Sequence, residues 1–210
     1  IEQLSIEARM TVCNMSIEAG ARAGLIAPDE KTFDYMRGKP LIPTGSAWAQ
    51  AMQHWQTLKT DDQATFDRDV RIDATAIVPQ VTWGTNPEMV VDVTGTIPDP
   101  AKENDLERRA RMERALEYMG LQPDQSIQSI PLDRVFIGSC TNSRLEDLRI
   151  AARVMDGQTC RLPTMIVPGS EQVKRAAEAE GLHQIFENAG AEWLAPGCSM
   201  CVAINGDKLG

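Results

Sequence analysis

The sequence is short of histidine, aromatic side chains and positive charge. Its 210 residues include two histidines, and 5% of them are aromatic. So few imidazoles leave cysteine as the main soft ligand for a metal. Acidic residues outnumber basic ones by 30 to 21, and the net charge of −9 argues against nucleic acid or an anionic membrane as the main partner. No apolar run approaches the roughly 20 residues that span a bilayer, so no membrane helix is expected.

Cysteine is scarce as well, and neither a signal peptide nor an initiator methionine is visible. Five cysteines, an odd number, are spread over the chain, whereas a disulfide-stapled secreted module is shorter and denser in cysteine. A reducing, cytoplasmic setting is therefore expected. The chain begins at Ile1 inside a polar, helix-patterned segment, which indicates a fragment of a longer protein. With 42% apolar and 24% charged residues, it has room for one large domain or two modest ones.

The first part of the chain, residues 1–75, is predicted to be mostly helical. Apolar spacing predicts helices over residues 2–20 and 47–58. Between them, Asp29 is expected to cap a short helix that ends at Gly38. The aromatic residues of the third helix are expected to pack in a core.

In the middle of the chain the pattern changes. Near-alternation of apolar and polar residues predicts a strand over residues 65–72. The segment Pro79-Gln-Val-Thr-Trp-Gly-Thr-Asn-Pro87 is rich in turn formers and is expected to be too polar for a core. A domain boundary is therefore placed just before it, near residue 76. A long charged helix with a solvated face is predicted over residues 103–118, closed by Gly120.

The last third has the most regular pattern. A buried-type strand is predicted over residues 135–138, and further strands over residues 164–167 and 191–194. Helices are predicted between them, one opened by a capping box from Ser143 to Glu146 and running through Met155, the other over residues 171–180. The order strand, helix, strand, helix, strand indicates an α/β fold with a parallel sheet.

Five of the chain's polar and sulfur-bearing positions follow the carboxyl ends of these strands. They are Cys140, the Gly169-Ser170 turn, and Cys198 with Cys201. Ligands bind at the carboxyl edge of open α/β sheets, so these segments are expected to meet at one site.

The three cysteines of that edge point to a metal or redox site. Thiolates are soft ligands that suit iron–sulfur clusters and zinc. A structural zinc site closes with four protein ligands, whereas three cysteines leave a coordination position open. A redox dithiol made of Cys198 and Cys201 alone remains an alternative, as does zinc with a fourth soft ligand. The candidates for that ligand are Cys160, His54 and His183; we interpret both histidines as surface residues, and Cys160 and Cys13 as unliganded thiols.

Longer motifs around these cysteines carry a family resemblance. The segments Val135-Phe-Ile-Gly-Ser-Cys-Thr-Asn-Ser-Arg-Leu-Glu-Asp-Leu-Arg149, Pro168-Gly-Ser170 and Pro196-Gly-Cys-Ser-Met-Cys201 resemble the cluster-binding segments of the aconitase superfamily. Two more, Arg9-Met-Thr-Val-Cys-Asn-Met-Ser-Ile-Glu-Ala-Gly-Ala-Arg-Ala-Gly24 and Val81-Thr-Trp-Gly-Thr-Asn-Pro87, narrow the resemblance to the large subunits of bacterial 3-isopropylmalate dehydratases. The resemblance covers nearly the whole chain.

This resemblance implies a cofactor and a set of site residues. A [4Fe-4S] cluster would be held by Cys140, Cys198 and Cys201. Glu18 would be catalytic, acting on the substrate hydroxyl or on water, and the surroundings of substrate and cluster would include Asn14, Asn142 and Ser170. Without the resemblance, Glu18 would be interpreted as a solvated helix carboxylate and Asn14 as an ordinary helix residue.

The resemblance also implies a fold, a reaction and a partner. The fold would be an aconitase-type three-layer domain with a parallel-strand core, spanning residues 76–210 and binding the cluster. Residues 1–75 would be the remnant of a preceding α/β domain. The reaction would isomerise 2-isopropylmalate to 3-isopropylmalate by loss and return of water, in leucine biosynthesis. Essential parts of the family's site lie outside this sequence, including a small swivel-domain subunit with a catalytic serine, so the fragment alone is expected to be inactive.

Two alternatives to this function stay open. The same chemistry could act on homoaconitate or citramalate, because side-chain specificity lies largely in the partner subunit. From a different class, the chain could be a non-catalytic metal-binding domain.

Overall fold

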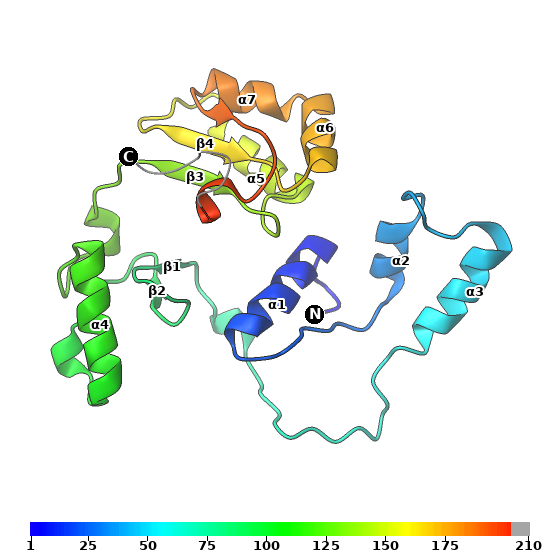
Figure 1. Ribbon diagram of the computed structural model, residues 1–210, viewed down its shortest axis with the longest axis horizontal. Helices are drawn as coiled ribbons and strands as arrows, with labels where there is room; N and C mark the ends of the chain where they lie inside the picture. The colour runs from blue at the N-terminus through cyan, green and yellow to red at the C-terminus, as the bar shows by residue number, and fades with distance from the viewer. Residues whose placement is uncertain (203–210) are drawn as a thin grey trace. The chain divides into compact units, whose positions relative to one another are not determined.

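The computed structural model describes residues 1–202 (Figure 1). Contacts group the chain into two compact units, Ile1–Ala64 with Asp133–Gly210, and Thr65–Leu132. This grouping differs from the division near residue 76, but contacts inside one chain do not test which domain of a longer protein each segment belongs to. The division into residues 1–75 and 76–210 stays a prediction. Within the described range, no helix has the length and apolar character needed to cross a membrane.

A parallel sheet forms the centre of the last third, as predicted. Strands β3 (Val135–Gly138), β4 (Thr164–Val167) and β5 (Glu192–Trp193) lie in the order β3-β4-β5. Both pairings are parallel; Val135 lies opposite Thr164, and Ile166 lies opposite Trp193. The first two strands have the predicted bounds, and the third is two residues shorter than predicted. The predicted α/β fold is confirmed.

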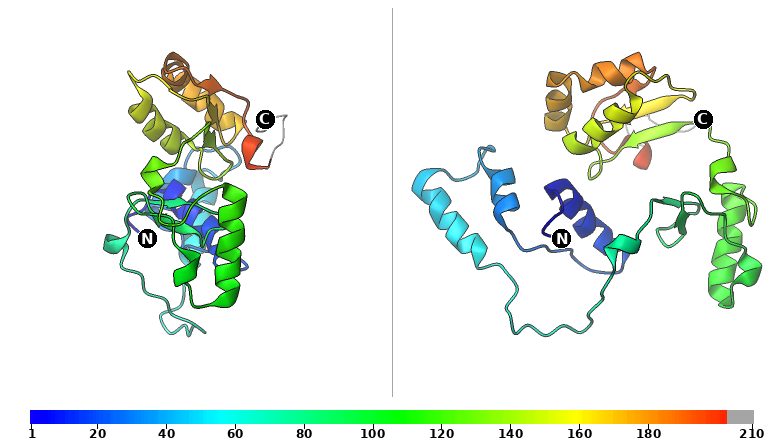
Figure 2. Two further views of the ribbon diagram at one scale, coloured as in Figure 1. Left: turned by 90° about the vertical axis from the view of Figure 1, so that its left-hand side faces the viewer. Right: turned by 180° about the vertical axis from the view of Figure 1, so that it is seen from behind.

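Three helices pack on this sheet and on one another (Figures 1 and 2). They are α5 (Leu145–Met155), α6 (Glu171–Ala179) and α7 (Leu182–Asn188). Their shared apolar core consists of Leu148, Ala152, Ile166, Ala177, Leu182, Phe186 and Ala191. The helices are expected to contact one another. The strands follow one another in chain order across the sheet, and two right-handed crossovers in the same direction place their helices on the same face of the sheet. This part of the chain therefore supplies a sheet layer and a helix layer, and the third layer stays a prediction.

Helix α7 was not predicted. Its residues follow directly after α6, separated by Gly181 with a φ of 74°. A glycine at that point indicates the end of a helix, and the short segment after it was interpreted as a polar turn. His183 lies in α7, where its ring centroid is 6.5 Å from that of Trp193.

The N-terminal part of the first unit contains three helices, as predicted: α1 (Ile6–Glu18), α2 (Glu30–Met36) and α3 (Gly45–Gln56). Asp29 caps α2 by accepting a hydrogen bond from the backbone N–H of Thr32. The aromatic packing expected of α3 is present, because Trp55 stacks on Phe33 with ring centroids 6.1 Å apart. No residue of α3 is fully buried, however.

The second unit is built on a hairpin and one long helix. Strands β1 (Gln80–Thr82) and β2 (Val90–Asp92) pair antiparallel, and α4 (Leu106–Met119) ends at Gly120 as predicted. Short 3-10 helices are η1 (Ala74–Ala76), η2 (Pro100–Lys102) and η3 (Ile127–Ser129). The core of this unit consists of Trp83, Met89, Ile97, Met112, Ala115 and Leu116.

Two predictions for the middle of the chain were wrong. The strand over residues 65–72 is absent: this segment is not assigned to any sheet, and Phe66, Val70 and Ile72 are 70%, 64% and 73% exposed. Alternation of apolar and polar residues is compatible with a strand that has one apolar and one polar face. A strand also needs a neighbouring strand to hydrogen-bond its backbone N–H and C=O groups. The segment at residues 79–87 is not too polar for a core, because Trp83 within it is 4% exposed. One large indole among turn formers is enough to anchor the hairpin.

Candidate metal centre

The first cysteine lies in a tight loop at the carboxyl end of β3. Ser139 follows the strand with a φ of 149°, a conformation that favours glycine. Its hydroxyl accepts a hydrogen bond of 2.8 Å from the backbone N–H of Asn142. This bond closes the turn around Cys140, whose side chain is exposed. The sequence thus holds the loop in a strained but hydrogen-bonded form that presents the thiol.

The loop after β4 locks against this turn. The N–H of Gly169 donates a hydrogen bond of 2.8 Å to the carbonyl of Ser143. A Cβ atom at Gly169 would lie 3.1, 3.1 and 3.2 Å from the carbonyl oxygens of Ser139, Ser143 and Cys140. Only a residue without a side chain allows this approach without displacing its neighbours. The glycine of the Pro168-Gly-Ser170 motif therefore helps to shape the Cys140 loop.

The other two cysteines lie in the loop after β5. The N–H of Gly197 donates to the carbonyl of Pro168 at 3.2 Å, which joins this loop to the one after β4. The 3-10 helix η4 (Ser199–Cys201) contacts β3, and the N–H of Cys201 donates to the carbonyl of Cys198 at 2.9 Å. Ser199 is fully buried and has a φ of 47°. Each cysteine loop therefore contains a non-glycine residue in a strained conformation, which is a feature of functional sites.

The thiols of the two loops interact. The pKa of Cys198 is raised, first by the charge of Cys140, then by a hydrogen bond to the same thiol and by burial, and last by the charge of Cys201. Sulfur atoms that repel one another in this way favour a cation between them. All five cysteines are free thiols. Among residues 1–202, no group of three or more His, Cys, Asp or Glu side chains is arranged as a finished metal site.

The donor set is chemically suited to an iron–sulfur cluster. Three soft thiols arrive from two loops that are interlocked at one sheet edge, while the remaining cysteines lie on other elements. Cys13 is on α1. Cys160 lies in the loop before β4, where its backbone N–H donates to the carbonyl of Ala189. Cysteine thiolates are the ligands by which proteins hold iron–sulfur clusters.

Ser170 has a structural task in this arrangement. Its hydroxyl caps α6 by accepting a hydrogen bond of 3.2 Å from the N–H of Val173. The predicted capping box of α5 is displaced by one residue: Arg144 is the N-cap, and its N–H donates to the Asp147 carboxylate at 3.0 Å. Ser143, the predicted cap, is instead fully buried, and its hydroxyl has no hydrogen-bond partner.

Helix α1 reaches the Cys140 loop through a residue that the sequence analysis missed. The hydroxyl of Thr11 lies 3.1 Å from Oδ1 of Asn142, and the hydroxyl of Ser5 donates to the Glu146 carboxylate at 2.8 Å. Asn14 and Glu18 follow Thr11 by three and seven residues, so all three share one face of the helix. Both are exposed. This shared spacing was the signal that could have identified Thr11.

The structure therefore brings some predicted site residues together and leaves others apart. Cys140, Asn142, Cys198 and Cys201 gather at the carboxyl edge of the sheet. Asn14 and Glu18 lie on the helix face that contains Thr11, and Ser170 is engaged at the start of α6.

The chain thus has an α/β architecture, in which three cysteines follow the carboxyl ends of strands in a parallel sheet. A sequence model of the Aconitase family (aconitate hydratase) matches residues 1–210. The chain belongs to the aconitase family.

Within that family, one curated relative is close. The 3-isopropylmalate dehydratase large subunit of Anaeromyxobacter dehalogenans is 56% identical over 209 residues, which is 100% of this chain and 44% of the relative. The chain thus spans less than half the length of that relative. The resemblance inferred from the sequence motifs is confirmed.

Proposed function

We propose that this chain is the cluster-binding part of a 3-isopropylmalate dehydratase large subunit. The observation that carries the proposal is that the loop of Cys140 and the loop of Cys198 and Cys201 are joined at one sheet edge, in a chain 56% identical to a protein of that name. The activity would be that of a hydro-lyase, which isomerises 2-isopropylmalate to 3-isopropylmalate in leucine biosynthesis. We place the protein in the cytoplasm, with a small subunit as its partner.

The three thiols would hold a [4Fe-4S] cluster. When bound, a cluster held by three cysteines supplies a Lewis acid for the removal and return of water. The chain's own residues would bind and orient the reacting groups. Asn142 is fixed at its N–H by Ser139 and at its side chain by Thr11, so its amide is preorganised to hydrogen-bond an oxygen at the edge of the site.

Helix α1 would supply the acid–base group. Glu18 is exposed on the face of α1 that meets the Asn142 loop. A carboxylate at that place can take a proton from, or return it to, the hydroxyl or water that leaves and re-enters. Asn14, one turn earlier on the same face, would hold the same oxygen or a substrate carboxylate by its amide.

Turnover by the full-length protein tests this proposal. The full-length large subunit and its small subunit are assayed together under anaerobic conditions with 2-isopropylmalate. We expect turnover that Cys140→Ser abolishes and that the matched control Cys160→Ser leaves intact. Turnover of homoaconitate or citramalate in place of 2-isopropylmalate would move the proposal to another substrate. Equal turnover by the two cysteine variants would refute it.

A further inference from the structure

We propose that the ion pair between the buried Arg9 and the partly exposed Asp29 positions helix α1, and through it the face that carries Asn14 and Glu18. This inference rests on the proposed function. It assigns a role in catalysis to two residues that lie on the opposite side of α1 from the reacting groups.

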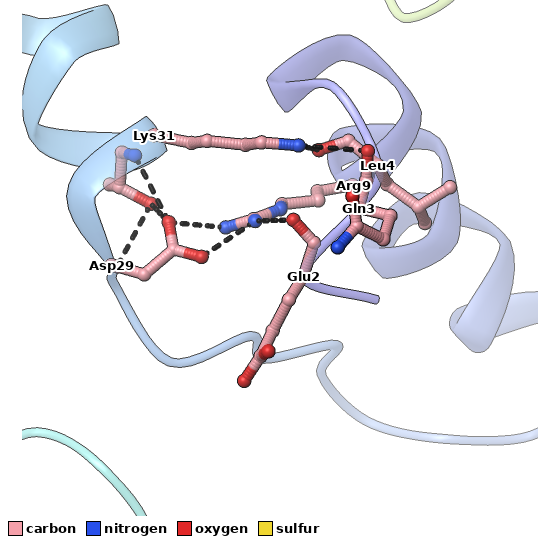
Figure 3. A network of polar contacts seen from close by, with 7 residues as sticks. Glu2, Gln3, Leu4, Arg9, Asp29 and Lys31 are labelled. Carbon is pink, nitrogen blue, oxygen red and sulfur yellow. Dashed lines mark hydrogen bonds and ion pairs between the residues drawn. The ribbon is translucent and has the colours of Figure 1, made fainter.

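The geometry of the pair is that of a clamp (Figure 3). The guanidinium of Arg9 donates two hydrogen bonds of 2.7 Å, one to each carboxylate oxygen of Asp29, and a third of 3.0 Å to the carbonyl of Glu2. Two parallel bonds between planar groups fix orientation as well as distance. Arg9 thereby joins three segments: the chain before α1, α1 itself and the start of α2.

Both ends of the clamp are anchored. Asp29 also caps α2, with its Oδ1 3.2 Å from the N–H of Thr32. On the same side, the Lys31 ammonium donates to the carbonyls of Gln3 and Leu4 at 2.8 and 3.2 Å (Figure 3). Movement of α1 relative to α2 would break the bonds from Arg9 to Asp29 and those from Lys31 to Gln3 and Leu4.

The pattern of burial indicates that the ion pair is the main contact between α1 and α2. Arg9 is 4% exposed, and Arg9 and Phe33 are the only buried residues between positions 1 and 64. No residue of the link over positions 19–28 is buried. An arginine removed from water needs a partner for its charge, and within residues 1–202 the ion pair of Arg9 is with Asp29. Little apolar packing is available to hold α1 if the pair is lost.

The helix geometry connects the clamp to the site. Glu18 follows Arg9 by nine residues, which is about two and a half turns, so it points away from Arg9. Thr11, Asn14 and Glu18 share the face that meets Asn142. Arg9 therefore sets the rotation of α1 from behind, while Thr11 contacts the Cys140 loop in front. Release of the clamp would let the helix turn and carry Glu18 out of place.

The test uses the full-length large subunit with its small subunit and four variants. Asp29→Asn leaves a buried charge without its partner, Arg9→Met removes the charge, and the double variant removes both charges. Arg9→Lys keeps the charge but loses the two-pronged geometry. The control is Lys102→Met, because Lys102 also donates to both carboxylate oxygens of one aspartate, Asp124, at 3.1 and 3.4 Å, and both residues belong to the second unit.

Three quantities are measured: kcat and KM per iron-loaded protein, urea unfolding, and hydrogen exchange of the α1 amides. We expect kcat to fall roughly tenfold to a hundredfold in Asp29→Asn and in Arg9→Met, with KM changed far less, because misplacing a reacting group slows the chemical step. The α1 amides exchange faster than in the unmodified protein. Arg9→Lys is intermediate, and Lys102→Met is unchanged in kcat and in α1 exchange.

The double variant separates positioning from mere stability. Without an unpaired buried charge, it recovers part of the stability that Asp29→Asn loses. Because the clamp is still absent, its kcat stays low and its α1 exchange stays fast. If kcat recovers together with stability, or if the single variants keep normal kcat and exchange, the inference is wrong. Absence of turnover in the unmodified protein would count against the proposed function alone, because exchange would still report on the clamp.

Discussion

The two parts of the first unit are held together in different ways. The α/β part after residue 133 has an apolar core that includes Leu148, Ile166 and Phe186, all at 0% exposure. The helical part before residue 64 has only Arg9 and Phe33 in buried positions. The cysteine loops are therefore placed by a packed sheet, and Glu18 is placed by an ion pair and a few polar contacts. Substitutions of the same kind should have unequal effects in the two parts.

The largest expected difference is between two buried phenylalanines. Phe186 and Phe33 are 0% and 1% exposed. Phe186→Ala should lower the free energy of unfolding by about 4 kcal/mol, because it opens a cavity in a continuous core. Phe33→Ala should lower it by roughly half as much, because fewer apolar groups surround Phe33. Urea unfolding of the full-length protein measures both, and equal losses would erase the distinction between the parts.

A smaller effect is expected at the glycine that supports the Cys140 loop. Gly169→Ala would place a Cβ about 3.1 Å from backbone oxygens that cannot move away as a side chain would. The strain should cost about 1–3 kcal/mol and reduce iron retention. The control is Gly157→Ala, which meets no atom within 4 Å but strains a φ of 68°. Iron analysis should find a loss only in the first variant; equal iron content would show that Gly169 does not shape the site.

The contact between α1 and the Cys140 loop should have a modest effect. Thr11→Val removes a hydroxyl 3.1 Å from Asn142 and keeps the shape of the side chain. We expect kcat to fall by a factor of about five, equivalent to about 1 kcal/mol for one hydrogen bond. A cycle with Asn142→Ala should be non-additive, since the two residues act through one contact. Additive losses would separate Thr11 from Asn142.

The smallest effect is on the pH dependence of stability, because solvent around the 35% exposed side chain of Asp29 screens the pair. The hydrogen bond from Arg9 is the first cause that lowers the pKa of Asp29 from 3.8 to about 2; Glu2 and Lys31 are the other charged groups nearby. A lowered carboxyl pKa gives stability that is complete above the unfolded value and is lost as pH falls toward the folded one. Unfolding should therefore show a loss between about pH 4 and pH 2 that Asp29→Asn removes. An unchanged profile would show that the pair adds nothing.

Local pattern was sufficient to predict most of the α/β part. Strands β3 and β4 have the predicted bounds because each is a short, mainly apolar run next to a glycine or a proline. Only β4 is fully buried, whereas the residues of β3 are partly exposed. The placement of the three cysteines followed from the topology of parallel sheets. Helix α7 was missed because Gly181 interrupts the helical pattern, and only packing of Phe186 against the sheet shows that the helix resumes.

Other features depend on contacts between distant residues. The segment at residues 65–72 alternates like a strand, yet strand formation needs a partner that the pattern does not specify. The clamp joins residues 20 positions apart. Nothing in the sequence around Arg9 or Asp29 distinguishes them from charged residues that are exposed to solvent. Thr11 was overlooked for the same reason, because its partner lies 131 positions away.

Iron analysis of the full-length large subunit tests the central claim most directly. The anaerobically reconstituted protein should contain about four irons and matching sulfide per chain, as a [4Fe-4S] cluster requires. Replacing Cys140, Cys198 or Cys201 singly with serine should lower that content, and replacing Cys160 should not. Full iron content in any of the three variants, or one zinc and no iron in the unmodified protein, would contradict the account.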